Sequence, residues 1–196
     1  MPSPSIHSTC VRGRLTFVRH GATAPNLAEL RCGGDLDVPL TDVGRRQALS
    51  AARSVAGLDP GIGVIVTSDL KRTRETATII AAALGGINIV VEPGFAERRL
   101  GAWNLLPIAA TQAQVRNGAT PPGGESELEF IRRINAALPT LLPYLSQRPL
   151  LVASKGVARA LCEIQGRPAD LSLANGEISH FDLASFSSFA FESRQP

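Results

Sequence analysis

RLTFVRHGATAPN, residues 14–26, is a short apolar run that passes without a break into charged residues. Its first five residues predict a buried strand, and Arg19, His20 and Gly21 follow directly. Arginine presents a planar fork of donors that suits phosphate, and histidine acts as a nucleophile or base near neutral pH. Such a triplet also occurs by chance, so it indicates a catalytic site only if other strands end in a similar way.

Five further segments predict strands. Residues 62–68, 87–92 and 150–154 are short apolar runs, which suits interior strands covered on both faces. Residues 177–185 alternate more between apolar and polar side chains, and residues 188–193 follow closely. These last two segments predict an antiparallel hairpin near an edge of the sheet.

Helical patterns lie between the strands, over residues 41–57, 70–86, 126–145 and 156–164. Thr41 is a suitable N-cap for the first helix, and Ser126 with Glu129 has the spacing of a capping box in the third. Pro139 and Pro143 predict a kink or break in that third helix. Strands that alternate with helices predict a layered α/β fold with a mainly parallel sheet.

The chain is long enough for one domain, which we expect over residues 14–196. Of its 196 residues, 44% are hydrophobic and 19% are charged, a balance typical of a globular protein. Residues 1–13 lack the apolar centre of a secretory signal and are expected to form a flexible leader. Residues 104–124 are the least regular part and are expected to form a loop.

Charge and cysteine content narrow the range of partners. The formal net charge of +3 is too small to indicate nucleic acid, and no basic run or aromatic platform supports such a partner. No apolar run approaches the ~20 residues that cross a bilayer, so we expect no membrane partner. The three cysteines, which lack metal-ligand spacing, indicate reduced thiols and a cytoplasmic location; they are Cys10, Cys32 and Cys162.

Two more strand ends carry side chains that suit phosphate chemistry. Arg72 follows the second strand and falls in the first turn of the next helix, and Glu97 follows the third strand. Taken alone, Arg72 is better explained by a solvated helix face, and a surface ion pair is the alternative for Glu97. Because ligands in such folds gather beyond the carboxyl ends of the strands, we expect both residues to meet His20 there.

At this point the chain resembles the histidine phosphatase superfamily, also called phosphoglycerate mutase-like. RHGATAPN fits the family's Arg-His-Gly-x-Thr-x-x-Asn signature, and four later segments fit the family in order: GDLDVPLTDVGRRQA (34–48), SDLKRTRETA (68–77), FAERRLGAW (95–103) and PPGGES (121–126). The resemblance covers about residues 14–185. It implies a three-layer α/β/α sandwich with a mainly parallel central sheet.

The resemblance also implies a mechanism without a metal or another cofactor. His20 would attack phosphorus and form a phosphohistidine, while Arg19 and Arg72 would hold the phosphoryl oxygens and Asn26 would add a hydrogen bond. Glu97 would protonate the leaving oxygen and then activate water. The implied partner is a small phosphorylated substrate, and the protein is expected to be a monomer or a homodimer.

One turn departs from the family, which usually has a second histidine there in an SHGG-like sequence. Here the turn is ASKG, so Ser154 takes the histidine position and Lys155 the glycine position after it. Neither His7 nor His180 obviously replaces the missing group. We assign Ser154 and Lys155 to phosphate binding: the hydroxyl keeps a shorter donor, and the ammonium restores charge if it turns inward. A lysine would be strained there if the position requires a positive φ.

Three functions remain open from the sequence. They are a phosphatase with an altered phosphate pocket, a weak or inactive member that binds a phosphorylated ligand or a protein, and a mutase-type phosphotransferase. Retention of the other five site residues favours the first function over the second. Twenty residues separate Trp103 from Gly124, and so small a cap leaves the site open to water, which favours hydrolysis over mutase activity.

The substrate itself is not evident from the sequence. Arg98, Arg99 or Arg116 would suit a second acidic group on the substrate, although a surface role explains each of them as well. Asp35, where the family often has a basic or aromatic residue, would instead disfavour an additional anionic group.

Overall fold

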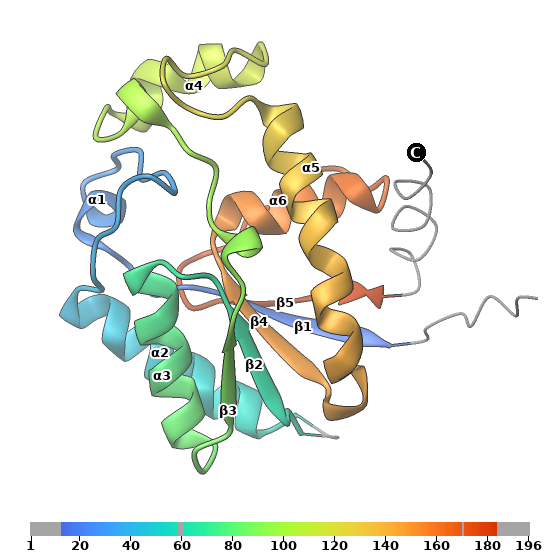
Figure 1. Ribbon diagram of the computed structural model, residues 1–196. Helices are drawn as coiled ribbons and strands as arrows, with labels where there is room; N and C mark the ends of the chain where they lie inside the picture. Colours follow the sequence, from blue (N-terminus) through green and yellow to red (C-terminus); the bar gives the residue numbers. More distant parts are fainter. Residues whose placement is uncertain (1–12, 59–60, 170, 184–196) are drawn as a thin grey trace, which may run out of the picture.

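The computed structural model describes residues 13–58, 61–169 and 171–183, and it confirms the α/β architecture. Within these residues, five strands form one sheet in the order β3-β2-β4-β1-β5. Neighbouring strands are parallel throughout, except that β5 runs antiparallel to β1 at the edge. Figure 1 shows helices on both sides of the sheet.

The elements have the following bounds. The strands are β1 (Arg14–Arg19), β2 (Val64–Thr67), β3 (Asn88–Val91), β4 (Pro149–Ala153) and β5 (Ile178–Asp182). The α-helices are α1 (Ala24–Leu27), α2 (Asp42–Ala56), α3 (Lys71–Ala83), α4 (Ile108–Arg116), α5 (Glu127–Ala137) and α6 (Lys155–Ile164). Short 3-10 helices are η1 (Pro93–Phe95), η2 (Gly101–Trp103) and η3 (Leu138–Gln147).

Alternating side chains of the inner strands divide the core into two layers. Leu15 and Phe17 of β1 pack with residues of α5 and α6, whereas Val18 packs with residues of α2 and α3. Strand β4 divides in the same way, with Leu151 on the first side and Leu150 on the second. The sheet is therefore the middle layer of a three-layer sandwich, as Figure 1 also shows.

Helix ends follow the signals in the sequence. The Thr41 hydroxyl accepts a hydrogen bond from the amide of Gly44 and caps α2. Ser126 and Glu129 form the expected capping box at the start of α5. The predicted break is also present, because α5 ends at Ala137 and the chain continues as the 3-10 helix η3.

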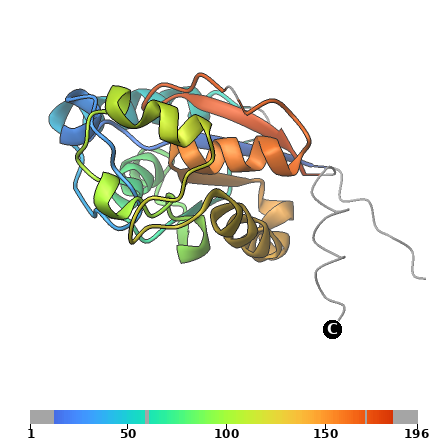
Figure 2. The same cartoon turned by 90° about the horizontal axis from the view of Figure 1, so that it is seen from above.

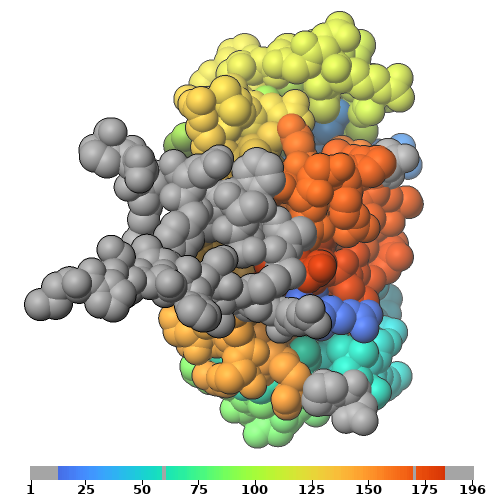
Figure 3. Space-filling view, turned by 90° about the vertical axis from the view of Figure 1, so that its right-hand side faces the viewer, coloured from blue at the N-terminus to red at the C-terminus, as the bar shows by residue number. Residues whose placement is uncertain are grey.

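The expectation of a loop over residues 104–124 is wrong in part, since α4 lies within it. Thr111 is the only buried residue of this helix, so its sequence lacks the apolar stripe that would have indicated a helix. Figures 1 and 2 show α4 at one end of the molecule, over the region between α1 and α6. In the side view of Figure 3, the α4 segment again lies at the top, above the segment that contains α6.

Some expectations fall outside the described residues. These include the strand at 188–193 and all of the leader except Gly13. Among the residues that are described, none of the helices has both the length and the apolar character that crossing a bilayer requires.

Close backbone contact joins α2 to the loop that follows β1. A Cβ atom added to Gly44 would collide with the carbonyl oxygen of Ala22, and one added to Gly21 would collide with the carbonyl oxygen of Gly44. Helix α2 can therefore approach this loop only because both positions are glycine.

We predict that Gly44→Ala lowers the free energy of unfolding by roughly 2–3 kcal/mol, because the added methyl group forces α2 away from the loop. Gly57→Ala is the matched control: Gly57 lies at the C-cap of α2 with φ −82°, and a Cβ there has its nearest neighbour at 3.6 Å. This control should change stability by no more than about 1 kcal/mol. Urea unfolding measures the free energy of unfolding of both variants. Equal losses in the two would mean that the contact between α2 and the loop after β1 is not rigid.

Candidate active site

The parallel pairing of β1 with β4 brings two charged turns together. Arg19 of β1 is in register with Ala153 of β4, and the amide of His20 donates to the carbonyl of Ala153 over 2.9 Å. The chain leaves β1 as Arg19-His20 and leaves β4 as Ser154-Lys155. The turns after β1 and β4 therefore lie side by side at the carboxyl ends of these two strands.

A cavity of about 630 Å³ opens at the carboxyl ends of the strands. Most of the residues predicted for the site line it, namely Arg19, His20, Asn26, Glu97 and Lys155. Two others, Arg72 and Ser154, are buried, with exposed fractions of 0% and 2%. The outer wall comes from α4, α5 and α6, so the helix that sequence analysis missed forms part of the site.

His20 is held as a neutral imidazole with one free nitrogen. Its Nδ1 lies 2.7 Å from the carbonyl oxygen of Gly21, which only accepts hydrogen bonds, so Nδ1 carries the proton. Burial of the ring, together with the positive charges of Arg72 and Arg19, holds the pKa of His20 well below its usual value. The Nε2 lone pair is consequently available near neutral pH, as nucleophilic attack requires.

Polar atoms near His20 lack partners within the described chain. The Nε atoms of Arg19 and Arg72 and the hydroxyl of Ser154 are buried without a hydrogen bond to any described residue. The remaining donors of Arg72 hold the carbonyls of Leu36 and Gly33, at 2.9 and 3.1 Å. Because buried polar groups are nearly always paired, two cationic donors and a hydroxyl left open indicate a site for an anion.

Asn26 lines the cavity, and Asn175 holds it in place from behind. The side-chain oxygen of Asn26 accepts hydrogen bonds from the amide and hydroxyl of Thr23, at 3.1 and 3.0 Å. Its amide nitrogen is thereby turned away from Thr23 and remains a donor. Asn175 donates to the carbonyl of His20 over 2.9 Å and to the oxygen of Asn26 over 3.3 Å. Asn175 was not among the predicted site residues, because no local sequence pattern connects it with His20.

The Glu97 carboxylate is anchored by two backbone amides. Arg98 N donates to Oε1 over 2.7 Å, and Gly156 N, in the first turn of α6, donates to Oε2 over 3.0 Å. A Cβ atom at position 156 would collide with Oε1. Glycine at position 156 therefore lets the Glu97 side chain reach the first turn of α6.

An ion pair between Arg133 of α5 and Glu125, which precedes that helix, stabilises the segment that carries Glu97. Arg133 binds both carboxylate oxygens of the buried Glu125, at 3.0 and 2.8 Å. Arg133 also donates to the carbonyls of Gly94, Ala96 and Glu97. Sequence analysis missed this role, although an arginine beside the apolar Phe130 and Ile134 positions of α5 is a usable signal for a buried partner.

The two residues that depart from the family lie at the start of α6. Ser154 is the N-cap, but its side chain makes no capping hydrogen bond. Lys155 is the first residue of the helix and is not among the residues with a positive φ, so the strain considered for a lysine at this position is absent. Its side chain is half-buried and lines the cavity.

The structure gives Asp35 a role in holding the backbone. Its carboxylate accepts hydrogen bonds from the amides of Leu100 and Gly101, at 2.9 and 2.7 Å. It does not belong to the lining of the cavity. Asp35 therefore stabilises a turn and is not itself part of the cavity wall.

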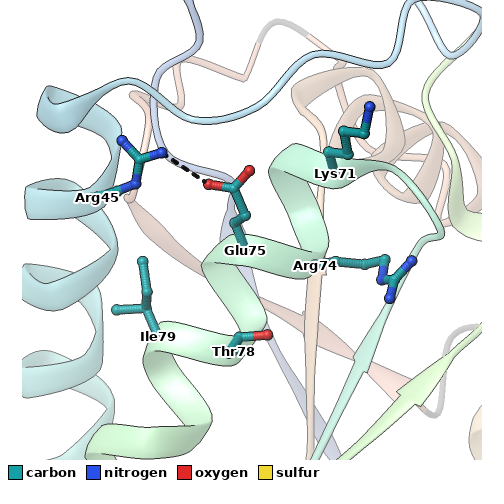
Figure 4. A pocket seen from close by; sticks show the side chains of 6 residues that line it. All are labelled: Arg45, Lys71, Arg74, Glu75, Thr78 and Ile79. Atoms are coloured by element: carbon teal, nitrogen blue, oxygen red, sulfur yellow. Dashed lines mark ion pairs between the residues drawn. The ribbon is translucent and has the colours of Figure 1, made fainter.

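A second hollow of about 540 Å³ lies between α2 and α3, and none of the predicted site residues lines it. Figure 4 shows Arg45 of α2 facing Glu75 of α3 across it, at a distance of 3.5 Å, while Arg74 points away. This hollow holds none of the buried unpartnered groups found around His20. The cavity at the ends of the strands is thus the better candidate for catalysis.

Comparisons with known proteins agree with this geometry. The model of the histidine phosphatase superfamily (branch 1) matches residues 15–196. A Yersinia pestis protein named probable phosphoglycerate mutase GpmB is 39% identical over 183 residues, which cover 85% of this chain and 83% of that protein. A mycobacterial glucosyl-3-phosphoglycerate phosphatase solved with VO3 has a TM-score of 0.72 and 28% identity, covering 86% and 90% of the two chains. An α-ribazole phosphatase from Shigella flexneri shares the fold, with a TM-score of 0.72 and 22% identity over 85% and 89% of the chains.

Proposed function

This chain belongs to the histidine phosphatase superfamily, and we propose that it hydrolyses a small phosphate monoester through a phosphohistidine at His20. The observation that carries the proposal is the neutral, buried His20 among cationic donors that have no partner in the described chain. Solved structures with this fold include phosphatases, one of them crystallised with VO3. A tetrahedral phosphoryl group would satisfy the open donors and lie against Nε2.

In the first step, Nε2 of His20 attacks phosphorus and the bond from phosphorus to the ester oxygen breaks. Glu97 in its protonated form gives its proton to the departing oxygen, so an alcohol leaves instead of an alkoxide. In the second step, Glu97, now ionised, takes a proton from water, which attacks phosphorus and releases His20 and inorganic phosphate. Covalent catalysis of this kind replaces one difficult displacement with two easier ones.

Arg19 and Arg72 neutralise the phosphoryl oxygens during both steps, and the amide of Asn26 adds a donor. Guanidinium groups supply the positive charge, so the scheme needs no metal or other cofactor. We infer that Ser154 and Lys155 together stand in for the family's second histidine. The unpartnered hydroxyl supplies a donor, and the ammonium of Lys155 at the cavity wall supplies charge.

Mutase chemistry is the second candidate, because the Yersinia pestis relative is named a probable phosphoglycerate mutase. We favour hydrolysis because the cap consists of one short helix, α4, over a cavity of about 630 Å³. A phosphoenzyme that passes its phosphate to added phosphoglycerate faster than to water would favour the mutase instead. A chain that binds a phosphorylated ligand without turnover is the third candidate, favoured only by the missing histidine. We also propose a cytoplasmic location, on the ground of the cysteine pattern.

We predict that the wild-type protein turns over 4-nitrophenyl phosphate and, with a ³²P-labelled ester, traps an acid-labile, alkali-stable label typical of phosphohistidine. His20→Ala should abolish the label and lower kcat by at least ~10³-fold, because the nucleophile is gone. His180→Ala is the matched control and should keep both activity and label, since His180 lies on the edge strand β5. Equal turnover by wild type and His20→Ala would reject the proposal.

We further predict that Lys155→Met lowers kcat about tenfold to a hundredfold, because one positioned charge is lost beside the phosphoryl group. Lys71→Met, which removes a lysine from the hollow between α2 and α3, is the matched control and should leave kcat unchanged. Ser154→His, alone and with Lys155→Gly, should raise kcat by restoring the family's donor. Steady-state assays on folded variants measure each effect, and a Lys155→Met enzyme as active as the Lys71→Met control would refute the role of Lys155.

A further inference from the structure

The wall of the catalytic cavity carries more positive charge than a phosphoryl group needs. Besides Arg19 and Lys155, it includes Arg31, from the segment after α1, and Arg159, one turn beyond Lys155 on α6. None of these four side chains forms an ion pair with any residue in the described part of the chain. When all charged side chains of the wall are counted together with buried Arg72, seven positive charges exceed the three carboxylates and a phosphate dianion by two.

Arg31 is held in a fixed position by the cap. Its Nε donates to the hydroxyl of Thr111 over 2.8 Å, and its Nη2 donates to the side-chain oxygen of Gln112 over 3.3 Å. Its backbone also pairs with Leu105 and Leu106. The remaining Nη1 has no hydrogen bond to a described residue, so one end of the guanidinium is oriented and unused.

This cluster of positive side chains is unfavourable without a ligand. Lys155 and Arg159 are like charges at positions i and i+4 of one helix, a spacing that destabilises it. Burial and the charge of Arg159 lower the pKa of Arg31, and burial, Arg159 and Arg19 lower that of Lys155. A second anion between Arg31 and Arg159 would relieve this repulsion in the same way as the phosphoryl group does around His20.

The same helix face limits the length of the ligand. Glu163 follows Arg159 by one further turn, about 6 Å along the axis, and lines the cavity together with Glu127. Burial and Glu127 raise the pKa of Glu163, so the two carboxylates lie near each other at this end. An anionic group is therefore favoured beside Arg159 and disfavoured one turn beyond it.

We propose that Arg31 and Arg159 form a second anion-binding subsite, so that the preferred substrate is a compact phosphate monoester with a second acidic group close to the ester. The acidic group is a carboxylate or a second phosphate. This proposal rests on the phosphatase function inferred above and adds the substrate class. Of the three arginines considered from the sequence, Arg98 is buried and donates to the carbonyls of Glu125 and Ala119, Arg99 does not line the cavity, and Arg116 lines it at the end of α4.

The test compares two esters of the same shape, 3-carboxyphenyl phosphate and 3-carbamoylphenyl phosphate. They differ in that the carboxylate is charged and the carbamoyl group is not. The wild-type enzyme should favour the carboxylate in kcat/KM by about tenfold, as expected for a charged hydrogen bond at a partly exposed site. Arg159→Gln and Arg31→Gln should each bring the ratio of the two kcat/KM values toward one. Arg99→Gln is the matched control for loss of a nearby charge and should leave the ratio unchanged.

Binding calorimetry distinguishes failure of the proposed subsite from failure of the proposed phosphatase function. Binding of both esters to the His20→Ala variant, which should not turn them over, is measured at low and high salt. This variant should bind the carboxylate more tightly, with a preference that a further Arg159→Gln substitution removes. Turnover of both esters with a ratio near one in wild type would overturn the subsite and leave the phosphatase intact. No turnover but a carboxylate preference that depends on Arg159 would support the subsite and reject the phosphatase. A preference that survives both substitutions would also overturn the subsite.

Discussion

The site depends on the parallel pairing of β1 with β4 in the middle of the sheet. This register makes the amide of His20 donate to Ala153, so the turns Arg19-His20 and Ser154-Lys155 leave the sheet together. A shift of one residue would exchange the side chains between the two faces and separate these groups. The apolar layers on both sides hold the register, and the chemistry at its end therefore rests on the core.

The electrostatics of the cavity follow from this placement. Cationic side chains gather around an imidazole that burial keeps neutral, and buried polar atoms of Arg19, Arg72 and Ser154 have no partner in the described chain. Such an arrangement is costly in the empty protein and becomes favourable when an anion enters. The ASKG turn fits the same scheme, because Lys155 adopts ordinary helical geometry and lies at the cavity wall instead of distorting the backbone.

The sequence predicted the positions of the strands well, because they are short apolar runs bounded by polar turns. It was wrong in placing β3 in the interior, since β3 lies at an edge of the sheet and is partly exposed. It also predicted which side chains follow β1, β2 and β4, and their convergence follows from the topology alone. Helix α4 was missed because its exposed side chains carry no apolar stripe. Asn175 and Arg133 act on residues far away in the chain, His20 and Glu97, through hydrogen bonds that no local pattern encodes.

The central claim is that the cavity is built to take up a tetrahedral anion next to a neutral His20. The most direct measurement is thermal unfolding of the wild-type protein with increasing orthovanadate, together with calorimetric determination of its Kd. Vanadate should raise the midpoint of unfolding progressively, with a stabilisation of about 2.7 kcal/mol at one hundred times Kd. A folded protein whose midpoint does not change with millimolar vanadate, and which shows no heat of binding, would contradict the claim.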